Sequence, residues 1–208
     1  MKISAVIFDF GGVIVRTEDR SSREQLAEEL NMTYEQLSDA IFASESARLA
    51  SLGRITAEDH WEAVRKALGL TDDDLPRIRD LFWAGDTLDF DLVDLIRSFR
   101  PGYRTALLSN AWDDLRGMLT GYWKIADAFD TIVISAEEGV VRPYPQIYET
   151  TLERLHLDPG QAVFVDDFIE NVQGAQAVGM QTIHFRSIDQ TRAELINILP
   201  NERFGSRQ

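Results

Sequence analysis

Polar side chains with catalytic potential follow several apolar stretches of this sequence. They are Asp9 after ISAVIF, Ser109 and Asn110 around the end of RTALLSN, Arg142 within GVVRPYPQIYE, and Asp166 and Asp167 after AVFV. Carboxylates bind Mg²⁺ and can attack phosphorus, whereas Arg and Ser side chains hydrogen-bond phosphoryl oxygens. Brought together, these residue types suit metal-assisted phosphoryl transfer.

Each of these groups also has a structural alternative. Asp9 could be a turn residue and Arg142 a surface residue before a proline turn. Ser109 and Asn110 could cap a following helix, a role that is compatible with anion binding at a helix N-terminus. The adjacent acids after AVFV could be a solvated strand end, but they repel each other unless a cation joins them. The position of all these groups after apolar runs favours the functional interpretation.

Apolar runs alternate with helical patterns over much of the chain. Buried parallel strands are predicted at 3–10, 104–109, 131–135, 162–167 and 181–185, and helices at 90–99, 111–120, 145–156, 170–178 and 189–198. This alternation predicts an α/β fold, a doubly wound, Rossmann-like parallel sheet with helices on both faces. Open sheets of this kind bind ligands at the carboxyl edge, where the polar groups would converge.

The interval from Arg16 to Asp86 interrupts the alternation. It shows no strand signal. Four helical stretches fit it, at 21–30, 34–51, 57–69 and 75–84, and Thr33 and Thr56 stand where the N-caps of the second and third would lie. We therefore predict a core domain of residues 1–15 and 87–208, with an inserted helical-bundle cap of residues 16–86. A cap inserted after the first strand would lie over the ligand-binding edge as a lid.

The overall composition limits the classes of protein to which the chain can belong. Its 208 residues carry a net charge of −14, which disfavours binding to nucleic acid or to an anionic membrane surface. The sequence has no Cys, no apolar run of about 18 residues and no signal-peptide layout at its N-terminus. We expect a cytoplasmic protein with a frayed tail at 201–208, and leave its oligomeric state open.

Four motifs stand in a recognisable order along the chain. They are IFDFGGV, LLSN, GVVRPYPQIYE and VFVDDFIENVQGAQAVGMQTI. With these motifs, residues 3 to about 185 resemble the haloacid dehalogenase-like hydrolase superfamily, and the helical insert resembles its small helical cap. The resemblance implies a Mg²⁺-dependent phosphatase that acts on a small phosphorylated metabolite through an aspartyl-phosphate intermediate.

The resemblance also implies roles for nine positions. They are Asp9 as nucleophile and metal ligand, Gly11 as a metal ligand through its carbonyl, Gly12, Ser109, Asn110 and Arg142 as phosphate-binding residues, Asp166 and Asp167 as metal ligands, and Asn171 as a supporting residue of the metal loop. Asp9, Ser109 and Arg142 would form the catalytic set.

Two of these positions depart from the family pattern. Arg142 stands where the family has Lys, which keeps the charge but changes its shape. Gly11 stands where the family has a second Asp, the general acid and base, whose help is typically worth about 10²–10⁴ in rate. Glu18 and Asp19 are the nearest acids in sequence that could replace it. Sugar-1-phosphatases with a similar opening motif also lack this acid, so its absence does not exclude activity.

Two other functions stay open at this point. A metal-independent 2-haloacid dehalogenase needs no proton donor for its halide leaving group, but has no use for two unneutralised acids after AVFV. A non-catalytic protein that binds metal or phosphate would account for both departures. If the chain is a phosphatase without acid assistance, substrates with good leaving groups should be favoured.

Overall fold

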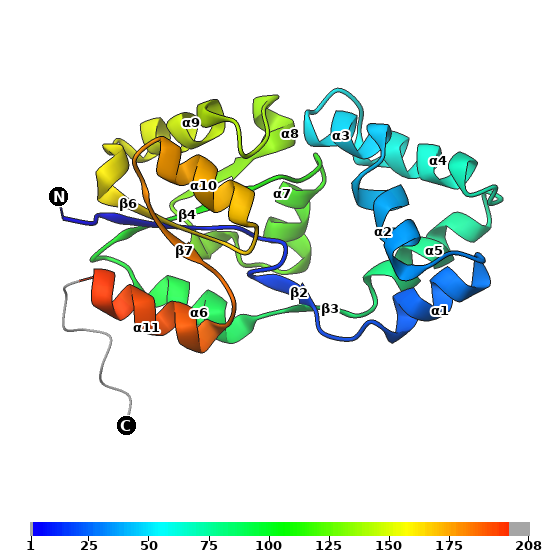
Figure 1. Ribbon diagram of the computed structural model, residues 1–208, viewed down its shortest axis with the longest axis horizontal. Coiled ribbons are helices and arrows are strands. Elements are labelled where there is room, and N and C mark those ends of the chain that lie inside the picture. The colour runs from blue at the N-terminus through cyan, green and yellow to red at the C-terminus, as the bar shows by residue number, and fades with distance from the viewer. Residues whose placement is uncertain (1, 200–208) are drawn as a thin grey trace.

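A parallel five-stranded sheet forms the centre of the computed structural model, which describes residues 2–199 (Figure 1). Its strands are β1 (Ala5–Phe8), β4 (Arg104–Ser109), β5 (Thr131–Ile134), β6 (Ala162–Asp166) and β7 (Gln181–His184). The order β5-β4-β1-β6-β7 places the first strand in the middle of the sheet. The predicted fold class is confirmed. The tail predicted at 201–208 lies outside the described residues.

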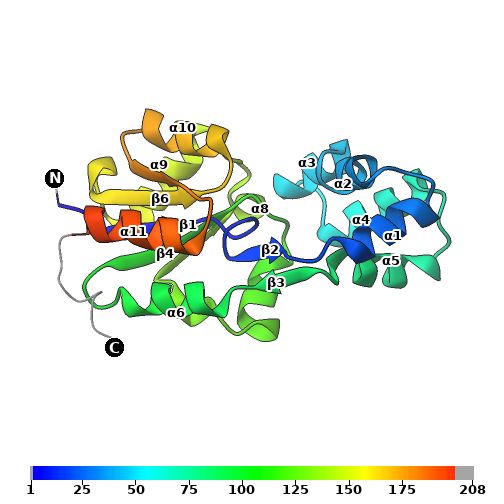
Figure 2. The same cartoon turned by 60° about the horizontal axis from the view of Figure 1, so that its bottom comes forward.

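Helices cover both faces of this sheet (Figure 2). One face packs against α6 (Phe90–Ser98) and α11 (Ile188–Ile198), the other against α9 (Pro145–Leu155) and α10 (Ile169–Ala177). Within β1, Val6 and Phe8 join the first layer and Ala5 and Ile7 the second, because successive strand side chains point to opposite faces. All four are fully buried, which explains why the strand is continuously apolar.

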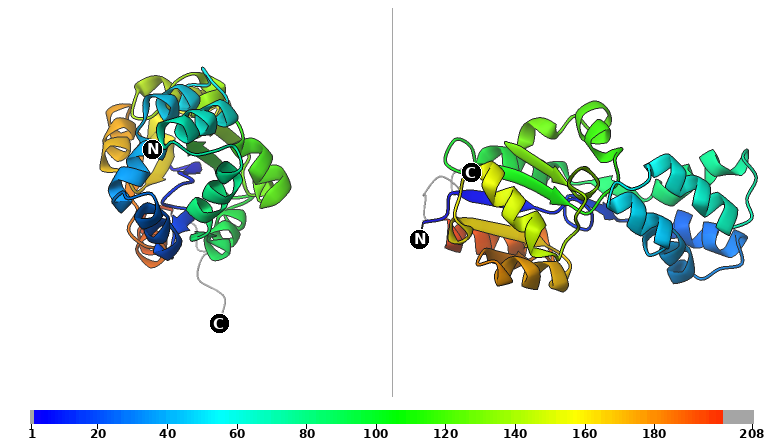
Figure 3. Two further views of the ribbon diagram at one scale, coloured as in Figure 1. Left: turned by 90° about the vertical axis from the view of Figure 1, so that its right-hand side faces the viewer. Right: turned by 90° about the horizontal axis from the view of Figure 1, so that it is seen from above.

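A helical unit lies between β1 and β4 in the chain. It consists of α1 (Ser21–Glu29), α2 (Tyr34–Phe42), α3 (Glu45–Ser51), α4 (Ala57–Ala67) and α5 (Asp74–Trp83). It has its own hydrophobic cluster, with Leu37, Ile41 and Phe82 fully buried. Figure 3 shows the unit beyond the carboxyl ends of the strands. The domain boundaries at 15/16 and 86/87 stay a prediction.

The local helix signals are mostly correct in this unit. Thr33 and Thr56 both form the predicted N-caps, each with a complete capping box. The single helix predicted at 34–51 is wrong, because two helices occupy that range. The Ser44 side chain accepts a hydrogen bond from the Ala47 amide at 3.3 Å and so begins a new helix.

A short antiparallel ribbon joins the helical unit to the sheet. Its strands are β2 (Val15–Thr17) and β3 (Asp86–Leu88), so the prediction of no strand between Arg16 and Asp86 is wrong. Three-residue strands are too short to produce an alternating pattern. The two connections touch beside the ribbon, where the Glu18 amide donates to the Gly85 carbonyl at 3.0 Å.

The helix predicted at 111–120 begins later than expected. A loop from Asn110 to Asp114 precedes α7 (Leu115–Gly117) and a π-helical turn, Met118–Tyr122. This loop reaches the helical unit, because Asp113 Oδ1 accepts a hydrogen bond from the Ala57 amide at 2.8 Å. Trp112 packs against the helical cluster. These long-range contacts hold residues 111–114 outside a helix.

The remaining helical segments are short. They are α8 (Ser135–Glu138) and two 3₁₀ turns, Ala126–Ala128 and Pro159–Gln161. Among the helices within residues 2–199, none combines the length and apolarity that crossing a membrane requires.

Candidate active site at the carboxyl edge of the sheet

Three carboxylates meet at the carboxyl ends of the two central strands. Phe8 of β1 pairs in register with Val165 of β6, so the next residues, Asp9 and Asp166, come side by side. The Asp9 amide extends this pairing by donating to the Val165 carbonyl at 2.9 Å. Asp9, Asp166 and Asp167 each offer an oxygen atom, and these atoms lie within 4.8 Å of one another. Such a group could hold a metal ion.

Arg142 lies between two of these acids. Its Nη1 forms an ion pair with Asp9 Oδ2 at 2.9 Å and donates a hydrogen bond to Asp166 Oδ2. The three side chains are almost completely buried. Asn110 fixes the arginine backbone in both directions, since its Nδ2 donates to the Arg142 carbonyl at 3.0 Å and its Oδ1 accepts from the Arg142 amide at 2.8 Å. Both ends of the Asn110 amide thus position Arg142, and a contact of Asn110 with phosphate stays a prediction.

Asp166 and Asp167 differ sharply in their hydrogen bonding. Asp166 Oδ1 accepts from the Phe168 amide at 2.7 Å, and both its oxygens accept from Asn171 Nδ2, at 3.1 and 3.2 Å. Asp167 Oδ1 is buried and has no hydrogen-bond partner in the structure. Because an unpaired buried carboxylate oxygen is costly, Asp167 is the member of the pair that is free to bind a cation. Asn171 thus contacts Asp166, and its role in supporting a metal-binding loop stays a prediction.

The two glycines after Asp9 have different environments. Gly12 has φ = +80°, and a Cβ at this position would lie 2.1 Å from Asp167 Oδ2. Glycine is therefore required where the β1 loop and the Asp167 carboxylate approach each other. A Cβ at Gly11 would meet nothing within 4 Å. The position of the missing acid is thus open space, and its backbone is compatible with a side chain.

Ser109 ends β4 beside β1 and is 3 % exposed. The following loop is held by Ser135, a buried residue that sequence reasoning did not select. Its hydroxyl accepts from the Ala111 amide at 3.0 Å and donates to the Ala111 carbonyl at 3.1 Å. The only sequence signal for Ser135 is its place at the end of the apolar run TIVIS.

Two further residues support the acidic loop. The Tyr148 hydroxyl donates to the Asn171 carbonyl at 2.8 Å. His184 Nε2 lies 2.9 Å from the Asp167 carbonyl oxygen and hydrogen-bonds to it. Neither contact is visible in the sequence, because each partner comes from a different part of the chain.

Glu18 and Asp19, the two acids proposed from sequence as substitute proton donors, form hydrogen bonds with neighbouring residues instead. Glu18 Oε1 accepts from Arg16 Nε at 3.0 Å, and its side chain is 56 % exposed. Asp19 Oδ1 accepts from the Ser21 amide at 2.8 Å. Both residues lie at the start of the connection to the helical unit. Within the described residues, no hydrogen bond or ion pair joins either acid to Asp9 or Arg142.

Burial and like charge make two of the acids weak. Burial raises the pKa of Asp9 from 3.8 to about 7, opposed by the Arg142 charge and reinforced by Asp166. Burial also raises the pKa of Asp167 to about 6, and the charge of Asp166 adds to this effect. Both pKa values are raised, as expected when carboxylates lie close together and no cation neutralises them.

These shifts predict a pH-dependent stability in EDTA. A carboxyl whose pKa is higher in the folded state stabilises the fold below about pH 4, and this contribution is lost as the pH rises through the folded value. Asp167→Asn should therefore unfold at a higher temperature than the parent at pH 8, by roughly 2–4 °C, the shift that about 1 kcal/mol produces at this size. This difference in unfolding temperature should disappear by pH 4. Thermal melts across this pH range measure it, and a gap independent of pH would contradict the assignment.

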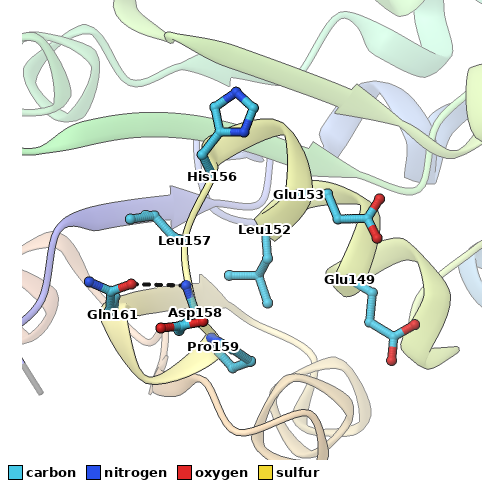
Figure 4. Close-up of a pocket in the computed structure, with 8 residues that line it drawn as sticks. All are labelled: Glu149, Leu152, Glu153, His156, Leu157, Asp158, Pro159 and Gln161. Atoms are coloured by element: carbon cyan, nitrogen blue, oxygen red, sulfur yellow. Dashed lines mark hydrogen bonds between the residues drawn. The ribbon is translucent and has the colours of Figure 1, made fainter.

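A separate surface hollow of about 700 Å³ lies away from these acids. Figure 4 shows it lined by Glu149 and Glu153 of α9 and by residues of the loop from His156 to Gln161. This loop leads into the amino end of β6, whereas Asp166 ends the same strand. The hollow therefore belongs to the opposite edge of the sheet from the candidate site.

Comparison with known proteins identifies the family. A family model for "haloacid dehalogenase-like hydrolase" matches residues 3–179. The chain belongs to this family. The match includes every residue of the candidate site, from Asp9 to Asn171.

Two proteins named as phosphatases are similar over most of the chain. A sesquiterpene phosphatase of Aspergillus oryzae is 27 % identical over 92 % of this chain and 94 % of its own length. A D-ribitol-5-phosphate phosphatase of Bacteroides thetaiotaomicron is 26 % identical over 95 % and 98 %. By contrast, the chain spans only 18 % of rat bifunctional epoxide hydrolase 2, with 33 % identity over 46 % of this chain.

A solved structure of the same family has the same fold. It is the magnesium complex of a family enzyme from Bacteroides thetaiotaomicron, which superposes with a TM-score of 0.74. The two chains are 23 % identical, and the alignment covers 90 % of this chain and 96 % of the other. At this level of identity, the likeness establishes the arrangement of helices and strands.

Proposed function

We propose that this hydrolase-family member is a Mg²⁺-dependent phosphatase of small phosphate monoesters. The observation that carries the proposal is the buried cluster of Asp9, Asp166 and Asp167 with Arg142 at its centre. Relatives named as sesquiterpene and D-ribitol-5-phosphate phosphatases, each similar along almost its whole length, support the reaction class.

The donor set fits a hard divalent cation. Three carboxylates and one guanidinium leave the cluster with excess negative charge, and Asp167 Oδ1 has no partner. In the proposal, Asp9, Asp167 and the Gly11 carbonyl hold Mg²⁺, with Asp166 beside them. The related structure solved as a magnesium complex supports this choice of metal. When bound, the ion would neutralise this charge and the charge of the phosphoryl group.

Asp9 is the proposed nucleophile. Its carboxylate attacks phosphorus, the bond from phosphorus to the ester oxygen breaks, and the phosphoryl group is transferred to Asp9. Water then hydrolyses the aspartyl-phosphate to release orthophosphate and regenerate the carboxylate. Ser109 and Arg142 would hydrogen-bond the phosphoryl oxygens, whose charge is stabilised by donors that are already in position. Asn110 would act indirectly by fixing Arg142.

The departing oxygen would take its proton from water. Gly11 supplies no acid, and Glu18 and Asp19 are bonded to their own neighbours. We therefore propose that leaving groups with a low pKa react fastest, because they need little proton assistance. The helical unit beyond the strand ends supports a small substrate, since it limits access for a macromolecule (Figure 3).

Hydrolysis of 4-nitrophenyl phosphate tests the proposed function directly. This substrate has a good leaving group, so the absence of an acid at position 11 does not suppress its turnover. We expect activity with Mg²⁺ that falls about 100-fold or more in EDTA and returns when Mg²⁺ is added back. Full activity in EDTA with haloacid substrates would instead assign a dehalogenase. No turnover of either substrate class would assign a binding protein.

A further inference from the structure

We propose that the organic part of the substrate is apolar and binds an aromatic surface between the helical unit and the sheet. Phe42, Trp83 and Trp112 form this aromatic surface. This inference rests on the proposed phosphatase function and specifies its substrate class. The favoured substrate is a phosphate monoester of an apolar alcohol, not of a polyol.

The aromatic surface is partly open to solvent. Phe42 is 50 % exposed and Trp83 is 38 % exposed, although both belong to a cluster of rings in contact. The Phe42 ring lies 5.7 Å from Trp83 and 6.5 Å from Trp112, measured between centroids. Phe82 lies buried behind them, 5.4 Å from Phe42 and 5.0 Å from Trp83. Grouped exposed aromatic side chains of this kind are typical of binding sites.

One ring of the surface belongs to the same loop as a residue of the candidate active site. Trp112 is two residues from Asn110, a separation of at most about 7 Å along the chain. Asn110 in turn holds the backbone of Arg142. Phe42 ends α2 and Trp83 ends α5, directly before the connection to the ribbon. A molecule with its phosphoryl group at Arg142 can therefore extend its other end over these rings.

The polar groups behind the rings offer little to a ligand, because Arg23 is paired and His60, whose Nε2 has no hydrogen-bond partner, is fully buried. Arg23 is 4 % exposed, donates to the Phe82 carbonyl at 2.6 Å, and bonds both carboxylate oxygens of Asp86 at 2.8 Å. His60 packs on Trp112 with 4.4 Å between centroids, and its Nδ1 pairs with the Ser46 hydroxyl at 2.9 Å. A polyol would lose hydrogen bonds to water here with little replacement, whereas a hydrocarbon gains by burial.

A series of n-alkyl phosphates from ethyl to octyl, kept below micelle-forming concentrations, tests the substrate class. The leaving-group pKa is nearly constant along the series, so a trend in kcat/KM reports contact with the chain. We expect kcat/KM to rise by up to about fourfold for each added methylene that is buried. Glycerol phosphate and ribitol 5-phosphate should react more slowly than octyl phosphate.

Substitutions connect this trend to the aromatic surface. Phe42→Ser and Trp83→Ser should flatten the chain-length dependence of kcat/KM, while Phe42→Leu should retain the slope. Ile196→Ser on α11 is the matched control, because Ile196 is 51 % exposed on a helix that leads away from the carboxyl edge. Binding of the product 1-octanol should shift tryptophan emission to shorter wavelength in the parent and not in Phe42→Ser, because the bound chain excludes water from the indole rings.

The outcomes separate this inference from the proposed function. Absence of turnover with 4-nitrophenyl phosphate overturns both together. Turnover of that substrate with equal kcat/KM for ethyl and octyl phosphate overturns the apolar substrate class alone. Light scattering that shows a dimer in the parent and a monomer in Phe42→Ser would assign the surface to a second copy of the chain, and would also overturn the inference.

Discussion

Replacing Asp9 with Asn is expected to lower kcat for 4-nitrophenyl phosphate by about 10⁴-fold or more, the size of effect seen when an enzyme loses its nucleophile. Asn has almost the same shape as Asp, so it keeps the packing around Arg142 while removing the attacking carboxylate. Initial rates with saturating Mg²⁺ measure the effect. Asp91→Asn, which changes an exposed acid of α6, should retain the parent rate.

Two readouts separate lost chemistry from lost folding in this variant. Burial raises the pKa of Asp9 to about 7, so the charged form is unfavourable in the metal-free fold. Asn at this position should therefore melt no lower than the parent at pH 8 in EDTA. Acid-quenched parent enzyme should carry one phosphoryl group on the peptide that contains Asp9. Full activity of Asp9→Asn, or phosphorylation of another residue, would contradict the nucleophile assignment.

Replacing Gly11 with Asp is expected to accelerate substrates with poor leaving groups by about 10²–10⁴-fold, the usual contribution of a general acid. The structure permits the change, because a Cβ at Gly11 meets nothing within 4 Å and the residue does not have a positive φ. The new carboxyl can give a proton to the departing alkoxide. Rates with alkyl phosphates should increase most, and the rate with 4-nitrophenyl phosphate should change little.

Gly11→Asn is the matched control for this acceleration. It adds a side chain of the same size that cannot donate an acidic proton. A plot of log kcat/KM against leaving-group pKa should be steep for the parent and Gly11→Asn, and flatter for Gly11→Asp. An equally flat slope in all three proteins would mean that another group already supplies the proton, and an equally steep slope would mean that the new carboxyl does not donate one. A collapse of activity on both substitutions would mean that the pocket requires glycine.

The sequence determined the fold class and the edge of the sheet at which the site forms. Short apolar runs such as ISAVIF are typical of strands buried on both faces, and β1 is fully buried as that pattern predicts. Parallel connections then bring the residues after each strand to one edge, so Asp9 and Asp166 could be grouped before any coordinates were known. Local residue patterns also predicted the N-caps Thr33 and Thr56, and both form capping boxes in the structure.

Contacts between distant segments were decided by the tertiary structure alone. No pattern in the sequence places the Asn110 amide on the Arg142 backbone, or Asp113 on the first residue of α4. It also could not distinguish Asp166, which is fully hydrogen-bonded, from Asp167, which keeps an unpaired oxygen. Such differences depend on side chains that approach across the fold, and no periodicity along the chain encodes them.

The aromatic surface shows the same limit most clearly. Phe42, Trp83 and Trp112 come from the end of α2, the end of α5 and the loop after β4. Hydrophobic periodicity assigns each ring to a helix or a loop. It does not distinguish Phe82, which is buried, from Phe42, which is half exposed, because both fit the helical pattern. The packing of the helical unit against the loop at Trp112 decides which rings stay open, because only assembled neighbours can exclude water from a side chain.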